Sequence, residues 1–323
     1  MFRTEVNIAI SPSKIDLQDK LLSIGSCFAE SIGGRLISNK FKACVNPYGV
    51  IFNPVSIFNL LSDTLQCVEP EADSYVKSEG VYFNYNFHSD LSNLDENALK
   101  SMIENAQKNT NELLKSSRWL IITLGTAVVY KRVDNGHIVA NCHKVPATSF
   151  SKCMLEPDEI LDSFNHFFSQ FQKVNDHCRI ILTVSPVRHI KDTLEVNALS
   201  KAILRTAAEK IRKGNDKIDY FPAYEMMIDD LRDYRFYKSD MIHPTETAED
   251  YIWEAFGKSY FDTDTQLFLK EWRKIKKALS HRPFHPESDK HQKFLKETIQ
   301  KLEKLQGKIT VDQEIAILNK QLL

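Results

Sequence analysis

Four short apolar segments divide this chain, and stretches with helical periodicity lie between them. The segments cover residues 21–24, 119–124, 179–184 and 218–221. Continuous apolar runs of this length are typical of strands buried on both faces, as in parallel sheets covered by helices. The clearest helical pattern follows Pro157, and a second precedes the last run. The apolar positions are Ile160, Phe164, Phe167, Phe168 and Phe171 in the first pattern, and Val196, Leu199, Ile203 and Ala207 in the second.

This alternation predicts an α/β fold, a flavodoxin-like three-layer α/β/α sandwich with a parallel central sheet over residues 20–256. Two insertions interrupt it. Residues 50–98 show no clear periodicity and are interpreted as loop, whereas residues 128–140 flank Asn135-Gly136, the pair that a type I′ hairpin turn requires. The sequence therefore predicts one large domain with a hairpin inserted in it.

After about residue 262 the composition shifts towards Lys, Glu, Gln and Leu at helical spacing. This shift predicts a helical C-terminal appendage, so we divide the chain into residues 1–260 and 261–323. The appendage either packs against the main domain or serves oligomerisation or partner binding. The sequence does not fix the oligomeric state.

Charge and cysteine usage exclude several function classes. The chain has 42 Lys and Arg against 43 Asp and Glu, a net charge of −1, so we expect no nucleic-acid partner. No apolar run approaches the roughly 18 residues of a membrane span, and the N-terminus lacks the apolar core of a signal peptide; we expect a cytoplasmic protein with no membrane contact. The six cysteines include no C-x-x-C pair, so we expect neither a disulfide framework nor a metal site, and no cofactor.

The first candidate catalytic group follows the first apolar run. Gly25-Ser26-Cys27 joins that strand to a helix marked by Phe28, Ile32 and Leu36. A nucleophile there lies at the carboxyl edge of the sheet, where open α/β folds place their ligands, and at the positive end of a helix, which lowers the pKa of a thiol. The alternative is that Ser26 caps the helix and Cys27 is a small buried residue.

A second candidate is the Asp240-x-x-His243 spacing ahead of Pro244. A histidine on this loop can take a proton from a nucleophile and return it to a leaving group, while Asp240 accepts the other ring N–H and fixes the tautomer. The same spacing also occurs at ordinary exposed helix entries. Its combination with the Gly25-Ser26-Cys27 junction favours the catalytic interpretation.

The string Gly25-Ser26-Cys27-Phe28-Ala29 resembles the signature of the GSCFA family, which is grouped with the SGNH/GDSL-like hydrolases. Further segments that resemble this family are Asn46-Pro47-Tyr48-Gly49, Leu124-Gly125-Thr126, Asn141-Cys142-His143-Lys144, Ser185-Pro186-Val187-Arg188-His189 and residues 240–244. The resemblance spans about residues 20–256. It implies an acyl-ester hydrolase that acts through a covalent acyl-enzyme.

The resemblance also suggests roles for single residues. The Gly-Asp-Ser motif of SGNH hydrolases places the nucleophile third, which favours Cys27; Ser26 takes the role if the turn is rotated by one residue. Gly49 resembles the glycine that donates its amide to the oxyanion, or is an ordinary turn glycine. The asparagine expected after Gly125 is absent, and Thr126 or Asn141 substitutes for it, or the oxyanion hole differs.

Two other segments are expected to border the site. His143 binds substrate or assists acid/base chemistry, or it is solvent-exposed or held structurally. Arg188 either binds a carboxylate or phosphate or forms a salt bridge. We expect Cys27, Gly49, Asn141, His143, Asp240 and His243 to surround one cleft.

Three functions remain open from the sequence. By analogy with the family, the substrate is a small-molecule or carbohydrate O-acyl ester. Acyl transfer from a thioester donor is the alternative within the enzyme class. A non-catalytic binding protein that keeps the fold is the alternative outside it.

Overall fold

The computed structural model describes residues 4–323. Its central sheet has five strands in the order β10-β9-β5-β1-β2, and every neighbouring pair is parallel. Counted along the chain this order is 2-1-3-4-5, the flavodoxin-like arrangement. The predicted parallel α/β sheet is confirmed; only the short, partly exposed edge strand β2 was not anticipated. The strands are β1 (Lys20–Gly25), β2 (Lys42–Val45), β5 (Trp119–Leu124), β9 (Arg179–Val184) and β10 (Ile218–Tyr220).

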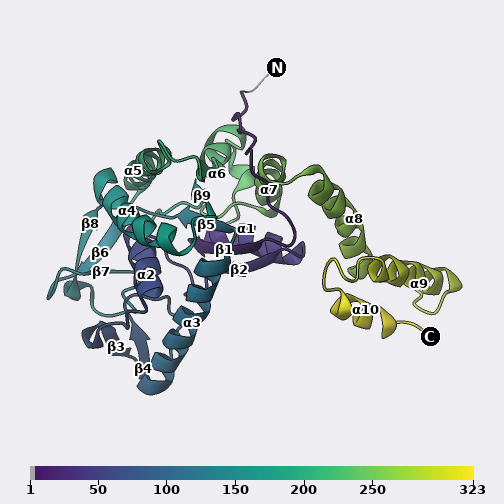
Figure 1. Cartoon of the computed structure of the whole chain (residues 1–323), viewed down its shortest axis with the longest axis horizontal. Helices are drawn as coiled ribbons and strands as arrows, with labels where there is room; N and C mark the ends of the chain where they lie inside the picture. Colours follow the sequence, from purple (N-terminus) through teal and green to yellow (C-terminus); the bar gives the residue numbers. More distant parts are fainter. Residues whose placement is uncertain (1–3) are drawn as a thin grey trace.

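Helices cover both faces of this sheet (Figure 1). One apolar cluster joins alternate residues such as Leu22 and Leu120 to α2, α3, α4 and α5. The intervening residues, such as Leu21 and Ile121, join a second cluster with α1 and α7. Strand side chains point to opposite faces in turn, so the continuous apolar runs supply both clusters. The helices are α1 (Cys27–Ser38), α2 (Pro54–Gln66), α3 (Glu96–Ser116), α4 (Pro157–Val174), α5 (Leu194–Arg212) and α7 (Glu246–Tyr260).

Helix α4 follows the predicted pattern. Ile160, Phe164, Phe167 and Phe171 are buried, and Phe168 packs at the margin of the same cluster. The helix begins with Pro157, and Glu156 and Glu159 form a capping box.

Helix α5 follows the predicted pattern only in its second half, where Ala207 is buried and Ile203 packs against the same cluster. Leu199 is exposed, whereas Asn197, Ser200 and Lys201 are buried ahead of Leu204. The first turns of α5 bury polar side chains because these bond to strand-end loops described below. An apolar pattern cannot reveal such a face.

The prediction of loop over residues 50–98 was wrong. This segment contains α2 and a hairpin of β3 (Tyr75–Ser78) and β4 (Val81–Asn84), preceded by the short helix η1 (Ala72–Ser74). Nine of the thirteen residues of α2 are buried, distributed around the helix. A helix buried on nearly all sides has no polar stripe, so it lacks the periodicity that would have revealed it.

The predicted hairpin around Asn135-Gly136 is confirmed and extended, but the predicted type I′ turn was wrong. Of the pair only Gly136 has a positive φ, +74°, and the strands are joined by the longer loop of residues 133–137. β6 (Val128–Arg132) pairs with β7 (Ile138–Val139) and, on its other side, with β8 (Phe150–Met154), all antiparallel. The short helix η2 (Ala147–Ser149) leads into β8. The result is a small three-stranded sheet attached beyond the end of β5.

Three further short segments connect β10 to α7. They are α6 (Ala223–Glu225), the π-helical turn η3 (Met226–Asp230) and η4 (Tyr234–Phe236).

The C-terminal helices extend away from the sheet domain (Figure 1). The predicted helical C-terminal region is therefore confirmed. They are α8 (Thr263–Leu279), α9 (Asp289–Glu303) and α10 (Asp312–Asn319), and they enclose a separate apolar cluster that includes Leu295, Leu302 and Val311. Trp272 fixes them to the end of α1 by donating its indole N–H to the Ser38 carbonyl at 2.9 Å. The appendage thus has its own small core.

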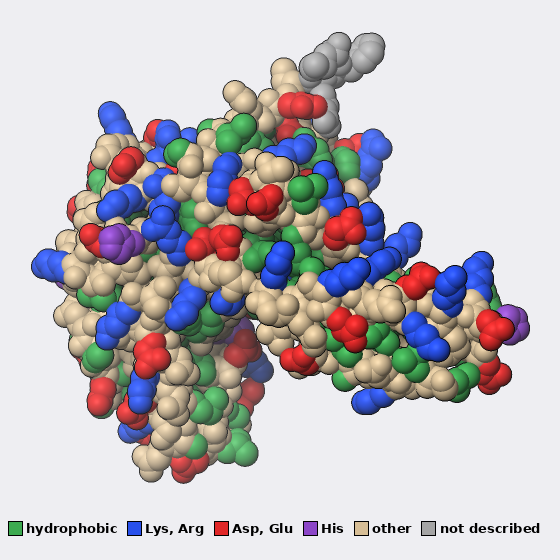
Figure 2. All heavy atoms as spheres, turned by 45° about the vertical axis from the view of Figure 1, so that its right-hand side comes forward, with side chains coloured by type: hydrophobic (Ala, Val, Ile, Leu, Met, Phe, Trp, Pro, Cys, Tyr) green, Lys and Arg blue, Asp and Glu red, His purple; other side chains and the backbone are tan. Residues whose placement is uncertain are grey.

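The surface in Figure 2 carries basic and acidic side chains interspersed with one another. Across residues 4–323 there is no helix long and apolar enough to cross a membrane. In the same range no three His, Cys, Asp or Glu side chains are grouped so that they could hold a metal ion.

Candidate active site

The turn between β1 and α1 is fixed by Gly25. Its φ of +139° is a conformation that other residues rarely adopt, and a Cβ there would lie 2.1 Å from the Thr123 carbonyl oxygen. Its N–H donates to Asn46 Oδ1 at 2.9 Å. Only glycine lets β1 pass this close to β5 before the chain enters α1.

Ser26 is the N-cap of α1. Its side chain accepts a hydrogen bond from the Phe28 amide at 3.4 Å, and its own N–H donates to the Thr123 carbonyl at 3.2 Å. Only 1% of its surface is exposed. The capping role that the sequence allowed for Ser26 is the one that its contacts show.

Cys27 is the first residue of α1 and is only half-buried. Burial raises the pKa of its thiol, and the negative charge of Glu30 one turn later raises it further; the amide of Cys27 itself acts in the opposite direction. The expected lowering of the pKa at the helix N-terminus was therefore wrong, because desolvation and Glu30 outweigh the amide.

The Asp240 and His243 side chains are paired as predicted. Asp240 Oδ2 lies 2.7 Å from His243 Nδ1, while Oδ1 accepts from the backbone N–H groups of Ile242 at 2.8 Å and His243 at 3.0 Å. These backbone bonds, and then the His243 ring, hold the pKa of Asp240 well below its usual range. An ionised carboxylate only accepts hydrogen bonds, so the neutral tautomer of His243 that fits this contact has its proton on Nδ1 and a lone pair at Nε2.

Arg188 anchors this loop. Its backbone N–H donates to the Ile242 carbonyl at 3.3 Å and its guanidinium to the Met241 carbonyl at 3.4 Å. The guanidinium lies 3.9 Å from the centre of the Tyr237 ring. Among residues 4–323 no carboxylate forms a salt bridge with Arg188, one of the two roles that the sequence allowed; Arg188 holds the loop by a cation–π contact and carbonyl bonds.

His243 and Cys27 lie at the same edge of the sheet. Helix α1 starts at the carboxyl end of β1, and α7 starts three residues after His243. At the other end of α7, Tyr260 packs against Trp119, the first residue of β5, with ring centroids 6.1 Å apart. α7 therefore runs, like α1, from the carboxyl edge to the amino edge, and the two helices are linked by an ion pair between Arg35 and Asp250.

Gly49 has φ +73°, and a Cβ there would lie 2.3 Å from the Cβ of His88. Its N–H donates to the Asn46 carbonyl at 2.8 Å. While this bond holds, the amide is not available to an oxyanion, and the contacts are those of the turn glycine that the sequence also allowed.

Both residues considered as substitutes for the missing asparagine are engaged. Thr126 donates its N–H to the Phe52 carbonyl, and its hydroxyl lies 3.1 Å from Ser200 Oγ. Asn141 donates to Ser89 Oγ at 3.3 Å and accepts from the His143 amide at 3.0 Å. Asn141 thus uses one of its two amide hydrogens, and in the Thr126–Ser200 contact either hydroxyl can be the donor.

His143 is held structurally, one of the roles that the sequence allowed. Its ring nitrogens lie 2.8 Å from the Asn84 carbonyl and 3.2 Å from Ser89 Oγ, and the ring stacks on Phe83 at 4.7 Å. Burial lowers its pKa. A neutral ring with both nitrogens bonded supports the loop and does not transfer protons.

The buried polar face of α5 contains functional candidates that the sequence did not reveal. Ser200 Oγ accepts from the Ala127 amide at 2.8 Å. Lys201 is fully buried, and its ammonium donates to the carbonyls of Gly125 at 2.7 Å and Ser185 at 2.8 Å. Burial lowers the pKa of Lys201 to about 7. One lysine thus ties together the loops that follow β5 and β9, and the only sequence signal was a lysine beside Ser200 in a predicted helix.

His189 is a second residue of this kind. Its backbone N–H donates to Asn197 Oδ1 at 2.9 Å, and its ring packs edge-to-face against Phe52, with ring centroids 5.3 Å apart. Burial, and then the charge of Lys201, lower its pKa to about 4; His243 also contributes to the lowering. With this pKa the His189 imidazole is neutral at pH 7, and its buried Nε2 makes no hydrogen bond with any residue from 4 to 323.

A cavity of about 590 Å³ opens beside these residues. Of the six residues expected to surround one cleft, Asn141 and His143 line this cavity, together with Thr126, whereas Cys27, Gly49, Asp240 and His243 are not part of its wall. One residue of the cavity wall, Phe52, lies near the nucleophile turn. Its carbonyl accepts from the amide of Gly125, whose added Cβ would lie 3.1 Å from the Cβ of Ser26.

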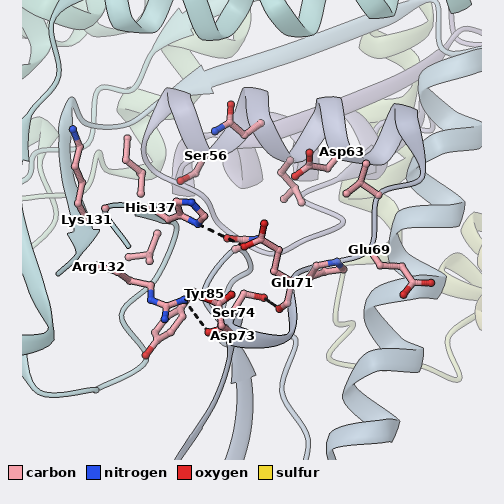
Figure 3. A pocket seen from close by; sticks show the side chains of 18 residues that line it. Ser56, Asp63, Glu69, Glu71, Asp73, Ser74, Tyr85, Lys131, Arg132 and His137 are labelled. Carbon is pink, nitrogen blue, oxygen red and sulfur yellow. Dashed lines mark hydrogen bonds and ion pairs between the residues drawn. The ribbon is translucent and has the colours of Figure 1, made fainter. Parts of the chain in front are cut away.

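A separate pocket of about 460 Å³ lies between α2, the loop before β3 and the β6–β7 hairpin. In Figure 3, Arg132 and His137 reach from the hairpin towards Asp73 and Glu71, with which they pair at 3.1 Å and 3.8 Å. None of the predicted site residues lines it. We therefore do not assign the active site to this pocket.

Fold and site together define a flavodoxin-like α/β protein with a Ser-Cys turn and an Asp-His pair at the carboxyl edge of its sheet. A sequence model of the GSCFA family matches residues 20–256, and a model of the GSCFA domain protein, C-terminal domain, matches residues 272–323. The chain belongs to the GSCFA family. No curated protein matches it.

Proposed function

We propose that this chain is an SGNH-like enzyme that cleaves or transfers the acyl group of an ester through a covalent intermediate on Cys27. The observation that carries the proposal is the bond of 2.7 Å between Asp240 and His243 Nδ1, which leaves Nε2 as a base. Its position at the edge of the sheet where Cys27 begins α1 supports the pairing of the two. The expected substrate class remains a small-molecule or carbohydrate ester.

Cys27 is favoured over Ser26 by exposure. Ser26 is almost fully buried and caps α1, whereas Cys27 is half-buried at the first helical position. The Cys27 amide interacts with the sulfur of the same residue, so this N–H lies next to the point where an oxyanion would form during attack by that sulfur. The raised pKa of the thiol means that the nucleophile depends on a base for its deprotonation.

The chemistry then takes two steps. Cys27 Sγ attacks the ester carbonyl as His243 Nε2 accepts the thiol proton, and that proton passes to the alcohol oxygen as the C–O bond breaks and a thioester forms. Water, or an acceptor hydroxyl in the transfer reaction, then gives its proton to Nε2 and attacks the thioester. Sγ leaves and is reprotonated. A reducing compartment, such as the cytoplasm that we expect, keeps this thiol free.

The test is a panel of short acyl esters and thioesters with wild type, Cys27→Ala, Ser26→Ala and His243→Ala, and with Cys67→Ala as the matched control at an exposed cysteine. We expect turnover in wild type and the control, and its loss in Cys27→Ala and His243→Ala. Intact-mass analysis should show one acyl adduct on Cys27, and added glycerol separates transfer from hydrolysis. Full turnover by Cys27→Ala would instead assign the role of nucleophile to Ser26.

A non-catalytic binding protein is the second candidate. It is favoured by the raised pKa of Cys27 and by the engaged Gly49 amide, since both weaken the machinery for acyl transfer. Absence of turnover and of any acyl adduct across the panel would support it.

A further inference from the structure

The buried ammonium of Lys201 joins two loops at the carboxyl edge of the sheet. It donates to the carbonyl of Gly125, directly after β5, at 2.7 Å, and to that of Ser185, directly after β9, at 2.8 Å. Two carbonyl oxygens that converge on one point repel each other through their partial negative charges unless a donor lies between them. The lysine therefore holds the two loops in one arrangement.

The first of these loops packs against the turn that carries the proposed nucleophile. A Cβ added to Gly125 would lie only 3.1 Å from the Cβ of Ser26, so the two residues are neighbours in space. Ser26 directly precedes Cys27, and its N–H donates to the Thr123 carbonyl in β5 at 3.2 Å. A displacement of the Gly125 carbonyl therefore changes the support of the nucleophile turn.

The second loop leads to the Asp240–His243 pair. Ser185 Oγ accepts a backbone N–H from two residues further along at 3.3 Å, which fixes the start of this loop. Arg188 follows one residue later and donates to the carbonyls of the two residues between Asp240 and His243, at 3.4 Å and 3.3 Å. The position of the proposed base therefore depends on the Ser185 loop.

Lys201 does not serve the stability of the fold. Its charge is buried, only desolvation acts on its pKa, and that pKa falls to about 7. A well-packed apolar side chain in place of a buried charge is often neutral or stabilising. Residues that break such a rule are expected at functional sites, where the cost is offset by what they hold in place.

We propose that Lys201 is a positioning residue that aligns Cys27 with His243, because one ammonium is bonded to the loops that support both. Its bonds go to backbone carbonyls, so it acts through these loops. The effect on turnover rests on the proposed function. The alignment is a property of the fold and can be measured without a substrate.

The kinetic test uses the short ester that the wild type turns over fastest. We expect kcat of Lys201→Met to fall about 100-fold, the loss that a misplacement of about 1 Å can cause, with KM little changed. Lys201→Gln keeps an N–H donor on a side chain one atom shorter and should recover part of kcat. Phe171→Leu, a core substitution in the last turn of α4, is the control for lost stability and should keep the wild-type kcat. Wild-type kcat in Lys201→Met, or an equal loss in Phe171→Leu, overturns the proposal.

Two NMR signals test the alignment without a substrate. The backbone amide of Cys27 is observed with isotope-labelled cysteine and assigned with Cys27→Ala, and the His243 ring is assigned with His243→Ala. We expect Lys201→Met to shift both signals, because it releases both loops. Arg188→Met should shift only the His243 signal, since Arg188 bonds to that loop alone, and Phe171→Leu should shift neither.

The two measurements separate this proposal from the proposed function. If neither signal moves in Lys201→Met, the positioning role fails even where the wild type turns over esters. If both signals move and the wild type turns over no ester, the proposed function fails and the positioning role is kept. Should Lys201→Met not fold, Lys201→Gln and Arg188→Met give the same comparison.

Discussion

Replacing Lys201 by methionine tests the most unusual group in the protein. The lysine is fully buried, and within residues 4–323 no carboxylate pairs with it; its ammonium bonds to the carbonyls of Gly125 and Ser185 and lies 5.9 Å from the centre of the Tyr224 ring. Methionine keeps most of the volume and removes the charge. It also leaves two carbonyls without their donor, a cost that does not depend on pH.

The size and sign of the effect follow from the pKa. Burial lowers it from 10.5 to about 7 in the folded protein. Between these two values the unfolded chain holds one more proton than the folded chain, so the free energy of unfolding rises with pH. The slope is about 1.4 kcal/mol per pH unit, which amounts to about 2 to 3 kcal/mol from pH 7.5 to pH 9.5. Below pH 7 the lysine is charged in both states and the full penalty applies.

The measurement is urea unfolding of wild type and Lys201→Met at several pH values from 6.5 to 9.5, with Lys213→Met as the control at an exposed lysine that caps the C-terminal end of the same helix. Tyrosines and cysteines with raised pKa values oppose the trend at high pH in all three proteins, so the difference between curves is the quantity of interest. We expect the wild-type and Lys213→Met curves to rise relative to Lys201→Met. Parallel curves for wild type and Lys201→Met would refute the reasoning, since Lys201 would then titrate as it does in the unfolded chain.

Three further outcomes are expected. Gly25→Ala should lower the free energy of unfolding by about 3 kcal/mol or more, because a Cβ cannot fit against β5, whereas the control Gly34→Ala, with open space around it, should raise it by up to about 1 kcal/mol. The urea midpoints of the two variants measure this difference, and equal midpoints would contradict the steric explanation. Iodoacetamide at neutral pH should label exposed Cys67 before Cys27, whose pKa is raised by burial, and mass spectrometry showing the reverse order would restore the activated thiol. Asp240→Asn should reduce kcat/KM by about 100- to 10,000-fold without unfolding the chain, since the histidine tautomer is no longer fixed; an unchanged rate argues against the Asp-His pair.

Local patterns in the sequence were sufficient for four of the five strands of the sheet and for the Asp240–His243 pair. Buried strands must be apolar along their whole length, so the runs at 119–124 and 179–184 coincide with β5 and β9. Asp240 and His243 lie in one short loop, so their spacing alone brings the carboxylate to the ring. Gly25 marks a turn because no other residue type tolerates its backbone and its closeness to β5.

What the sequence could not supply was the environment of polar groups. Whether Gly49, Thr126 and Asn141 are free or bonded depends on segments that meet them only in the folded chain. The same holds for helix α2, whose burial on nearly all sides removes its periodicity.

The chain by itself therefore determined the parallel α/β fold and the positions of Cys27, Asp240 and His243 at strand and helix ends, because backbone conformation and apolar periodicity are local properties. Only the tertiary structure decided that the thiol of Cys27 has a raised pKa, that Lys201 bonds to the Gly125 and Ser185 carbonyls, and that His189 Nε2 is buried without a partner among residues 4–323. Desolvation and hydrogen bonding depend on which distant segments surround a group, and no local pattern records that.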